Sequence, residues 1–176
     1  MRLLLLIMLL PCPIWSAISW DPSVRLSLNH AGTLFSRDID PSESHWSSLW
    51  LSADTILLSF TAADRHTLSM PLSIKYRSGS EQHGRLHLEG AAGGGISLEY
   101  MVRITERMAA SLSADILFLW YGSCGGGSWM AGATASFIYL PIRRIMLSIP
   151  VSLAWSRGEM MYSIGIAAGL RLGRLE

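Results

Sequence analysis

The chain has 176 residues, the size of a single domain, and is 50% hydrophobic but only 15% charged. Typical globular chains carry about 25% charged residues, so a soluble surface would be short of charge. The formal net charge of +1 excludes the strongly basic surface that nucleic-acid-binding domains present.

Residues 1–19 have the order of a secretory signal peptide: Arg2, an apolar run at 3–10, then prolines and small residues. The apolar run is shorter than the roughly 20 residues of a membrane-spanning helix, which disfavours an uncleaved anchor. Lipidation of Cys12 is a second alternative, disfavoured by the proline that precedes this cysteine. We expect cleavage after Ser19, leaving a mature domain of residues 20–176 with one cysteine and no intramolecular disulfide.

Alternation with a period of two residues runs along the mature chain and predicts β-strands. One face of each segment is apolar, while the other carries serine, glycine, alanine and isolated charges. Within 49–61, this pattern places Ile56, Leu58 and Phe60 on the apolar face. The eight predicted strands are residues 22–30, 49–61, 67–77, 86–104, 108–121, 129–140, 145–155 and 161–174.

Two glycine triplets, 93–95 and 125–127, raise the question of a phosphate-binding loop. Such a loop requires a lysine after the glycines and the N-terminus of a helix, and a predicted strand follows each triplet instead. We expect the first triplet to lie within a long strand, where glycine permits close packing, and the second to form an external hairpin turn.

The pattern predicts an all-β fold, an eight-stranded antiparallel transmembrane β-barrel. The small polar face suits the narrow lumen of such a barrel. The connections "AADRH", "TER" and "PIRR" are short and residues 31–48 form a long one, which places both termini on the periplasmic side. A soluble β-sandwich or lipocalin-like binding protein is the alternative. Aromatic residues near strand ends are candidates for interfacial girdles: Tyr76, Phe118, Trp120, Trp129, Phe137, Tyr139, Trp155 and Tyr162.

The segments "GGGISLEYMVRITERMAASLSADILFLWY" and "YSIGIAAGLRLGRLE" resemble the small eight-stranded outer-membrane proteins of the OmpA, OmpX and OmpW type. The resemblance implies location in the cell outer membrane, outer-membrane lipid and the insertion machinery as partners, and surface loops or a narrow porin-like conduit for a small solute. Family members commonly end on an aromatic residue read by that machinery. This chain ends Arg174-Leu175-Glu176, so we expect weaker recognition.

Strand parity directs a set of charged side chains of mixed sign into the lumen. They either form a structural network of paired charges, because an unpaired charge there is costly, or line a polar path with a gate. The residues of this predicted lumen charge network are Arg25, Lys75, Glu99, Arg103, Asp115 and Arg171.

The long connection 31–48 and the tryptophan that follows it form a candidate contact surface for an extracellular ligand, through His45, Trp46 and Trp50. An alternative is a lipid-modifying enzyme, with His45 and Ser47 as base and nucleophile and Glu43 or Asp54 as the acid. We expect no enzyme and no cofactor. We also expect no metal site, because His83 and His87 would lie roughly 13 Å apart on an extended chain.

Overall fold

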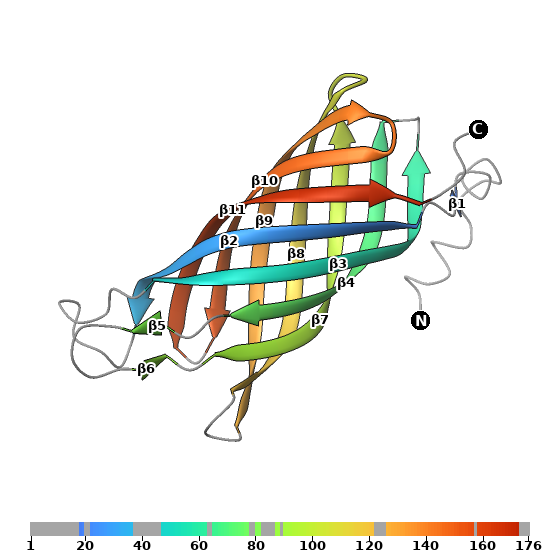
Figure 1. Cartoon of the computed structure of the whole chain (residues 1–176). Coiled ribbons are helices and arrows are strands. Elements are labelled where there is room, and N and C mark those ends of the chain that lie inside the picture. The colour runs from blue at the N-terminus through green and yellow to red at the C-terminus, as the bar shows by residue number, and fades with distance from the viewer. Residues whose placement is uncertain are drawn as a thin grey trace, which may run out of the picture.

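The computed structural model is an all-β protein and describes residues 18–19, 22–36, 47–62, 65–77, 80–81, 87–88, 90–121, 126–156 and 158–172 (Figure 1). Within these ranges, no helix is long and apolar enough to cross a membrane. The strands are β1 (Ile18–Ser19), β2 (Ser23–Ser36), β3 (Ser47–Ala62), β4 (His66–Arg77), β5 (Ser80–Glu81), β6 (His87–Leu88), β7 (Ala91–Arg103), β8 (Met108–Tyr121), β9 (Gly127–Ile142), β10 (Ile145–Ser156) and β11 (Glu159–Arg171).

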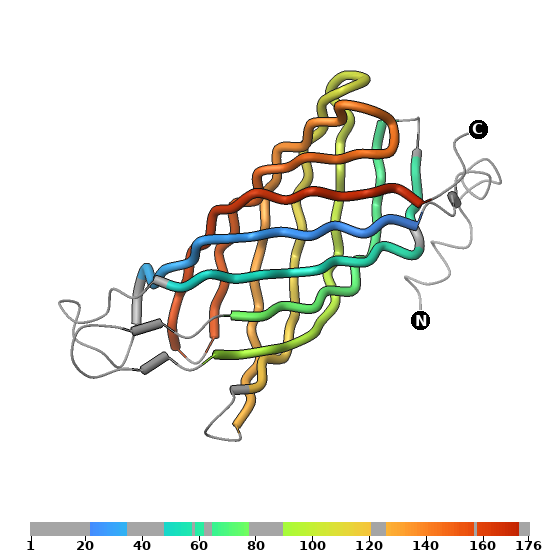
Figure 2. Tube along the Cα trace, in the orientation of Figure 1, coloured from blue at the N-terminus to red at the C-terminus, as the bar shows by residue number. Residues whose placement is uncertain are grey.

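Eight of these strands form a closed antiparallel barrel. Each of β2, β3, β4, β7, β8, β9, β10 and β11 pairs with the next in that order. The ring closes because β11 also pairs with β2, from Glu159 opposite Ser36 to Arg171 opposite Ser23. In Figure 2 the blue trace of β2 therefore runs beside the red trace of β11. Both strands have all their neighbours, so the barrel has no free edge between them.

Side chains alternate between the two faces of the barrel wall, with the apolar ones outside. In β7, Ile96, Leu98 and Tyr100 are exposed, while Ser97 and Glu99 between them are buried. Large exposed apolar side chains occur in all eight strands of the ring. A soluble lipocalin-like barrel has the opposite arrangement, and a sandwich does not close, so the closed ring with its apolar exterior contradicts both alternatives.

The two ends of the barrel differ in their connections (Figure 1). One end, called the turn end, carries the start of β2, the end of β11 and three short connections, at residues 63–65, 104–107 and 143–144. The opposite end, called the loop end, carries the connections 37–46, 78–90, 122–126 and 157–158. The last of these is tight and contains Gly158 at φ 81°, a backbone conformation that favours glycine.

Several predicted boundaries require correction. β2 extends to Ser36 and β3 begins at Ser47, so part of the predicted 31–48 loop is strand; residues 37–46 lie outside the described residues. β7 begins at Ala91 rather than at residue 86. The second glycine triplet contributes Gly127 to the start of β9, and the predicted turn residues 122–125 lie outside the described residues.

The parity predicted for β3 is wrong in its first half, where Ile56 faces the lumen and is buried. The β3–β4 register shifts between Ile56 and Ser59, so β3 holds one more residue than its partner there. Such a bulge reverses which face each side chain meets. It lies opposite Pro71, which has no N–H for the ladder.

The first glycine triplet lies within β7, as predicted, at a close approach to β8. A Cβ built on Gly95 would lie 2.1 Å from the carbonyl oxygen of Ile116 and 2.6 Å from the Cα of Leu117. At Gly94 the nearest atom would be 3.5 Å away. Gly95 therefore permits a backbone approach that a larger residue would disrupt.

We expect Gly95→Ala to lower the free energy of unfolding by about 1–3 kcal/mol, because backbone atoms of β8 must shift. The neighbouring Gly94→Ala is the matched control, which we expect to be neutral or stabilising by a few tenths of a kcal/mol. Urea unfolding of both variants in lipid vesicles, followed by tryptophan fluorescence, measures the difference. Equal stability of the two variants would contradict the close approach.

Candidate functional site

The lumen is filled largely by small polar side chains that project inward from the strands. Serines are the most frequent buried polar residues, and they come from six strands of the ring. Small side chains suit an eight-stranded barrel, whose interior is only wide enough for side chains to fill. These buried serines are Ser23, Ser27, Ser48, Ser52, Ser59, Ser69, Ser73, Ser97, Ser111, Ser148 and Ser156.

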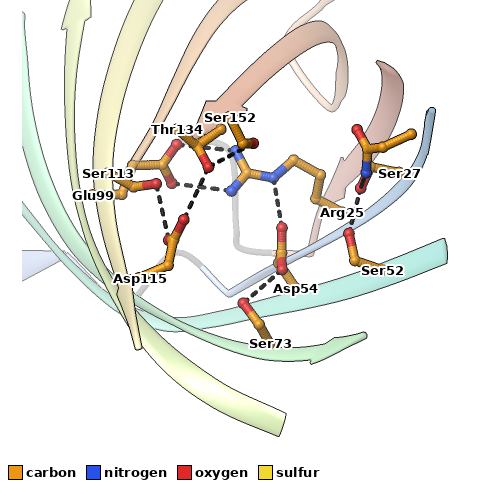
Figure 3. Close-up of polar contacts among 11 residues, drawn as sticks. Arg25, Ser27, Ser52, Asp54, Ser73, Glu99, Ser113, Asp115, Thr134 and Ser152 are labelled. Carbon is orange, nitrogen blue, oxygen red and sulfur yellow. Dashed lines mark hydrogen bonds and ion pairs between the residues drawn. The ribbon is translucent and has the colours of Figure 1, made fainter. Parts of the chain in front are cut away.

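Arg25 is the centre of the charged part of the lumen (Figure 3). Its Nη1 and Nη2 atoms donate to Glu99 at 3.0 and 3.3 Å, and its Nε donates to Asp54 at 3.2 Å. The guanidinium thus binds one carboxylate with two parallel hydrogen bonds and a second with its remaining edge. Because β2 and β7 are not adjacent in the ring, the Arg25–Glu99 pair connects two walls across the lumen.

Hydroxyl groups satisfy carboxylate oxygens that Arg25 does not reach (Figure 3). Ser73 donates to Asp54 at 2.7 Å. Asp115 accepts hydrogen bonds from Ser113 at 3.0 Å and from Thr134 at 2.9 Å. This arrangement holds three carboxylates in a narrow interior, each with several donors, as buried charge requires.

Apolar clusters close the lumen on both sides of the charged layer. The loop-end cluster consists of Ala31, Trp50, Leu117, Leu119, Met130 and Met161. The turn-end cluster consists of Ala109, Ile138, Leu140 and Met146. A polar layer between two largely apolar layers lies in a low-dielectric interior, which strengthens its ion pairs and hydrogen bonds.

Small cavities follow one another along the lumen. The central one has a volume of about 50 Å³ and is lined by Arg25, Asp54, Lys75, Glu99 and Asp115, among others. One toward the loop end and one toward the turn end each have about 40 Å³. Since a water molecule needs about 10–15 Å³ on this scale, each cavity has room for a few waters.

The predicted lumen charge network is brought together only in part. Arg25, Glu99 and Asp115 face the lumen in its charged layer, and Lys75 lines the same central cavity. Arg171 lines the cavity near the turn end, and Arg103 is half-buried at the end of β7. The gate role of these residues stays a prediction.

The predicted contact surface requires a correction at Trp50. Its side chain is only 6% exposed and belongs to the loop-end cluster inside the barrel, where the Arg77 guanidinium carbon lies 5.8 Å from its ring centroid. The parity of β3 before its bulge turns Trp50 inward. His45 and Trp46 lie outside the described residues.

Of the serine, histidine and acid set of the enzyme alternative, the structure tests only the position of Asp54. Asp54 lies in the lumen, where it binds Arg25 and Ser73. Glu43 and His45 lie outside the described residues. Among the residues that the structure describes, no group of three or more His, Cys, Asp or Glu side chains converges in a way that could hold a metal ion.

The predicted lumen charge network omits the buried Arg77 of β4, and it also omits Asp54 of β3. The signal for Asp54 was present in "SLWLSADTILLSF", where Leu49 and Leu51 alternate with Ser48, Trp50, Ser52 and Asp54. The three consecutive apolar residues 56–58 mark the position where this alternation changes phase. A phase change of this kind is the sequence sign of a bulge.

Comparison with solved structures places this geometry among known barrels. Neisserial surface protein A (NspA) superposes with a TM-score of 0.55 at 10% identity, covering 88% of this chain and 99% of that one. The chain has the fold of a small outer-membrane β-barrel. Ail, the attachment invasion locus protein of Yersinia pestis, gives 0.54 at 11% identity over the same shares of each chain.

A second crystal structure of Ail, in complex with the heparin analogue sucrose octasulfate, also gives 0.54 at 11% identity and covers 86% of this chain and 98% of that one. No family model matches the chain, and no curated protein matches it in sequence. At these identities the likeness establishes the barrel fold.

We expect Arg25→Met to lower the free energy of unfolding by about 3–5 kcal/mol, because it leaves the carboxylates of Glu99 and Asp54 without a cation. Adding Glu99→Gln to Arg25→Met should restore part of the loss. Lys75→Met is the matched control, since Lys75 forms no salt bridge within the described ranges and should cost about 1 kcal/mol or less. Denaturant unfolding in lipid vesicles measures all three variants, and equal losses for Arg25→Met and Lys75→Met would refute the central role of Arg25.

Proposed function

We propose that the protein is an integral outer-membrane barrel with a closed lumen, exported by its signal peptide, whose loop end is the functional surface. The single observation that carries this proposal is the apolar exterior, which runs round all eight strands of a barrel with a polar interior. Lipid is the solvent that such a surface fits, because a closed barrel leaves no backbone group unpaired in it.

Aromatic residues at the two ends of the apolar exterior support membrane location. Tyr76, Trp120, Trp129, Trp155 and Tyr162 are exposed near the loop end. Tyr100 and Tyr139 are exposed near the turn end. Along β9, Trp129 and Tyr139 are ten residues apart, or about 33 Å at ~3.3 Å per residue. A strand tilt of about 40° reduces this to about 25 Å, the height of the apolar band in outer-membrane barrels.

Because the lumen is filled with side chains, the role of a membrane anchor is favoured over that of an open pore. Its cavities have volumes of only about 40–50 Å³ each, and paired charges and apolar side chains line them. The function is therefore assigned to the segments that connect strands at the loop end. Residues 37–46 and 78–90 are the longest connections there, and the first contains His45 and Trp46, which we propose as contacts for an extracellular ligand. The likeness to Ail, an attachment protein, agrees with this role.

A narrow, gated conduit is the second candidate, and the continuity of the lumen favours it. The central cavity shares Asn29, Lys75, Asp115 and Ser152 with the loop-end cavity, and Arg25 and Glu99 with the turn-end cavity. Separation of the Arg25–Glu99 pair would join the central and turn-end cavities. The pair is then the gate of the predicted lumen charge network.

Membrane fractionation of the full-length chain tests the location. We expect the protein in the outer-membrane fraction, processed to the size of residues 20–176, with an unboiled band on a detergent gel that migrates differently from the boiled one. A closed barrel resists the detergent until it is heated, which causes the shift. Recovery from the soluble periplasmic fraction, without a heat-dependent shift, would refute the proposal.

Ion conductance in planar bilayers separates the anchor from the conduit. We expect no steady current from the wild-type protein or from Glu99→Gln, because the apolar clusters still close the lumen after the Arg25–Glu99 pair is lost. A known porin in the same bilayer is the positive control. A current that appears with Glu99→Gln would favour the conduit instead.

A further inference from the structure

Arginines gather at the turn end of the barrel. They lie in three short connections or at the ends of the adjoining strands. Four of them are exposed and one is half-buried. We call this set the arginine rim; it consists of Arg65, Arg103, Arg107, Arg143 and Arg144. Glu106 is the acidic residue that accompanies them among the described residues of these three connections.

Backbone hydrogen bonds fix the rim to the barrel wall. The amide of Arg103 donates to the carbonyl of Arg65 at 2.8 Å, which joins the β3–β4 and β7–β8 connections. The amide of Leu140 donates to the carbonyl of Arg107 at 2.8 Å, and this joins the β7–β8 connection to β9. The rim thus follows neighbouring strands from β4 to β10 along one side of the turn end (Figure 1).

The charges of the rim are available for an external partner. Within the described part of the chain, none of its five arginines forms a salt bridge. The sequence of these connections holds five arginines against two acidic residues, Asp64 and Glu106, which leaves an excess of three positive charges. Guanidinium groups form bidentate hydrogen bonds with phosphate, so a surface of this composition fits phosphate-bearing partners.

The position of the rim relative to the aromatic residues is the one expected for contact with lipid headgroups. Tyr100 and Tyr139 each lie three residues inside the turn end of their strands, and both are exposed. Tyr100 also bonds to the ring of His66, Oη to Nδ1, at 2.7 Å. Three residues correspond to about 10 Å along a strand. If tyrosines mark the edge of the hydrocarbon, the arginines lie at the depth of the lipid headgroups.

We propose that the arginine rim binds the headgroup phosphates of anionic phospholipids in the leaflet that the turn end faces. This inference rests on the membrane location proposed above. Basic residues close to an anionic membrane surface each strengthen binding by roughly fivefold. The rim would select anionic over zwitterionic lipid round this side of the barrel and fix the depth at which the barrel lies.

The test compares lipids that differ in headgroup charge. The folded wild-type protein, in a mild non-ionic detergent, receives equal amounts of phosphatidylglycerol and phosphatidylcholine with the same acyl chains. Native mass spectrometry counts the lipids that stay bound. We expect the wild type to retain phosphatidylglycerol preferentially, and the triple variant Arg107→Gln, Arg143→Gln, Arg144→Gln to lose most of this preference, at least tenfold.

Glu106→Gln is the matched control of opposite sign. Glu106 is exposed and lies in the same turn as Arg107. We expect its replacement by glutamine to increase the preference for phosphatidylglycerol. A triple Arg→Lys variant at 107, 143 and 144 should keep an intermediate preference, since lysine retains the charge without the bidentate fork. The heat-dependent gel shift confirms for each variant that the barrel is folded.

Three results would overturn the inference while leaving the membrane barrel intact: a folded wild type without headgroup preference, a folded triple variant with full preference, or displacement of the lipid by an equal concentration of inorganic phosphate. The last result would indicate a site for free phosphate. A wild type that shows no heat-dependent shift would instead refute the proposed function, and the rim proposal with it.

Discussion

The pairing of β2 with β11 is the interaction on which the rest of the structure depends, because it closes the sheet. Open edges expose unpaired N–H and C=O groups, which cannot remain unpaired in lipid. Closure fixes the number of strands, and eight strands leave an interior just wide enough for side chains. From this follow the serine-rich lumen, the short inward side chains and the glycines at close approaches between strands. The apolar side chains that would form the core of a soluble barrel are displaced to the exterior.

The charged layer is the part of the interior where geometry matters most. Arg25 holds two carboxylates from β3 and β7, and hydroxyls from several strands complete the hydrogen bonds of Asp54 and Asp115. A buried pair of this kind adds little net stability over an apolar replacement, but removing one partner is costly. We interpret the network as a device that fixes the register of non-adjacent strands. Tryptophan and methionine fill the remaining space at the loop end, where Trp50 lies beneath Arg77.

Much of this architecture is predictable from alternation alone. All eight strands of the ring and the inward positions of Arg25, Glu99 and Asp115 follow from parity, because a strand has only two faces. Closure follows from the small polar face, which suits a narrow lumen. The positions of Asp54 and Trp50 were predicted wrongly because a bulge in β3 shifts the inward–outward alternation by one residue. When the alternation is extended from Ile56 toward the start of β3, every side chain is placed on the wrong face. Arg25–Glu99 contact was not predictable, since parity shows that both residues face inward but not at which height they meet. The height of each side chain along the barrel axis depends on the stagger between strands. The periodicity of the sequence carries no information on this stagger.

Site-directed spin labelling of β9 tests the central claim, an apolar exterior in lipid round a filled polar lumen. Ala131, Ala133 and Ala135 face outward, whereas Thr134 and Ser136 face inward. In a Cys124→Ser background reconstituted in lipid vesicles, labels at the three alanine positions should collide with oxygen, which concentrates in lipid, far more often than with a water-soluble nickel chelate. Labels at the two inward positions should be immobile and shielded from both. Outward labels that meet the nickel chelate as freely as they would in water would contradict the account.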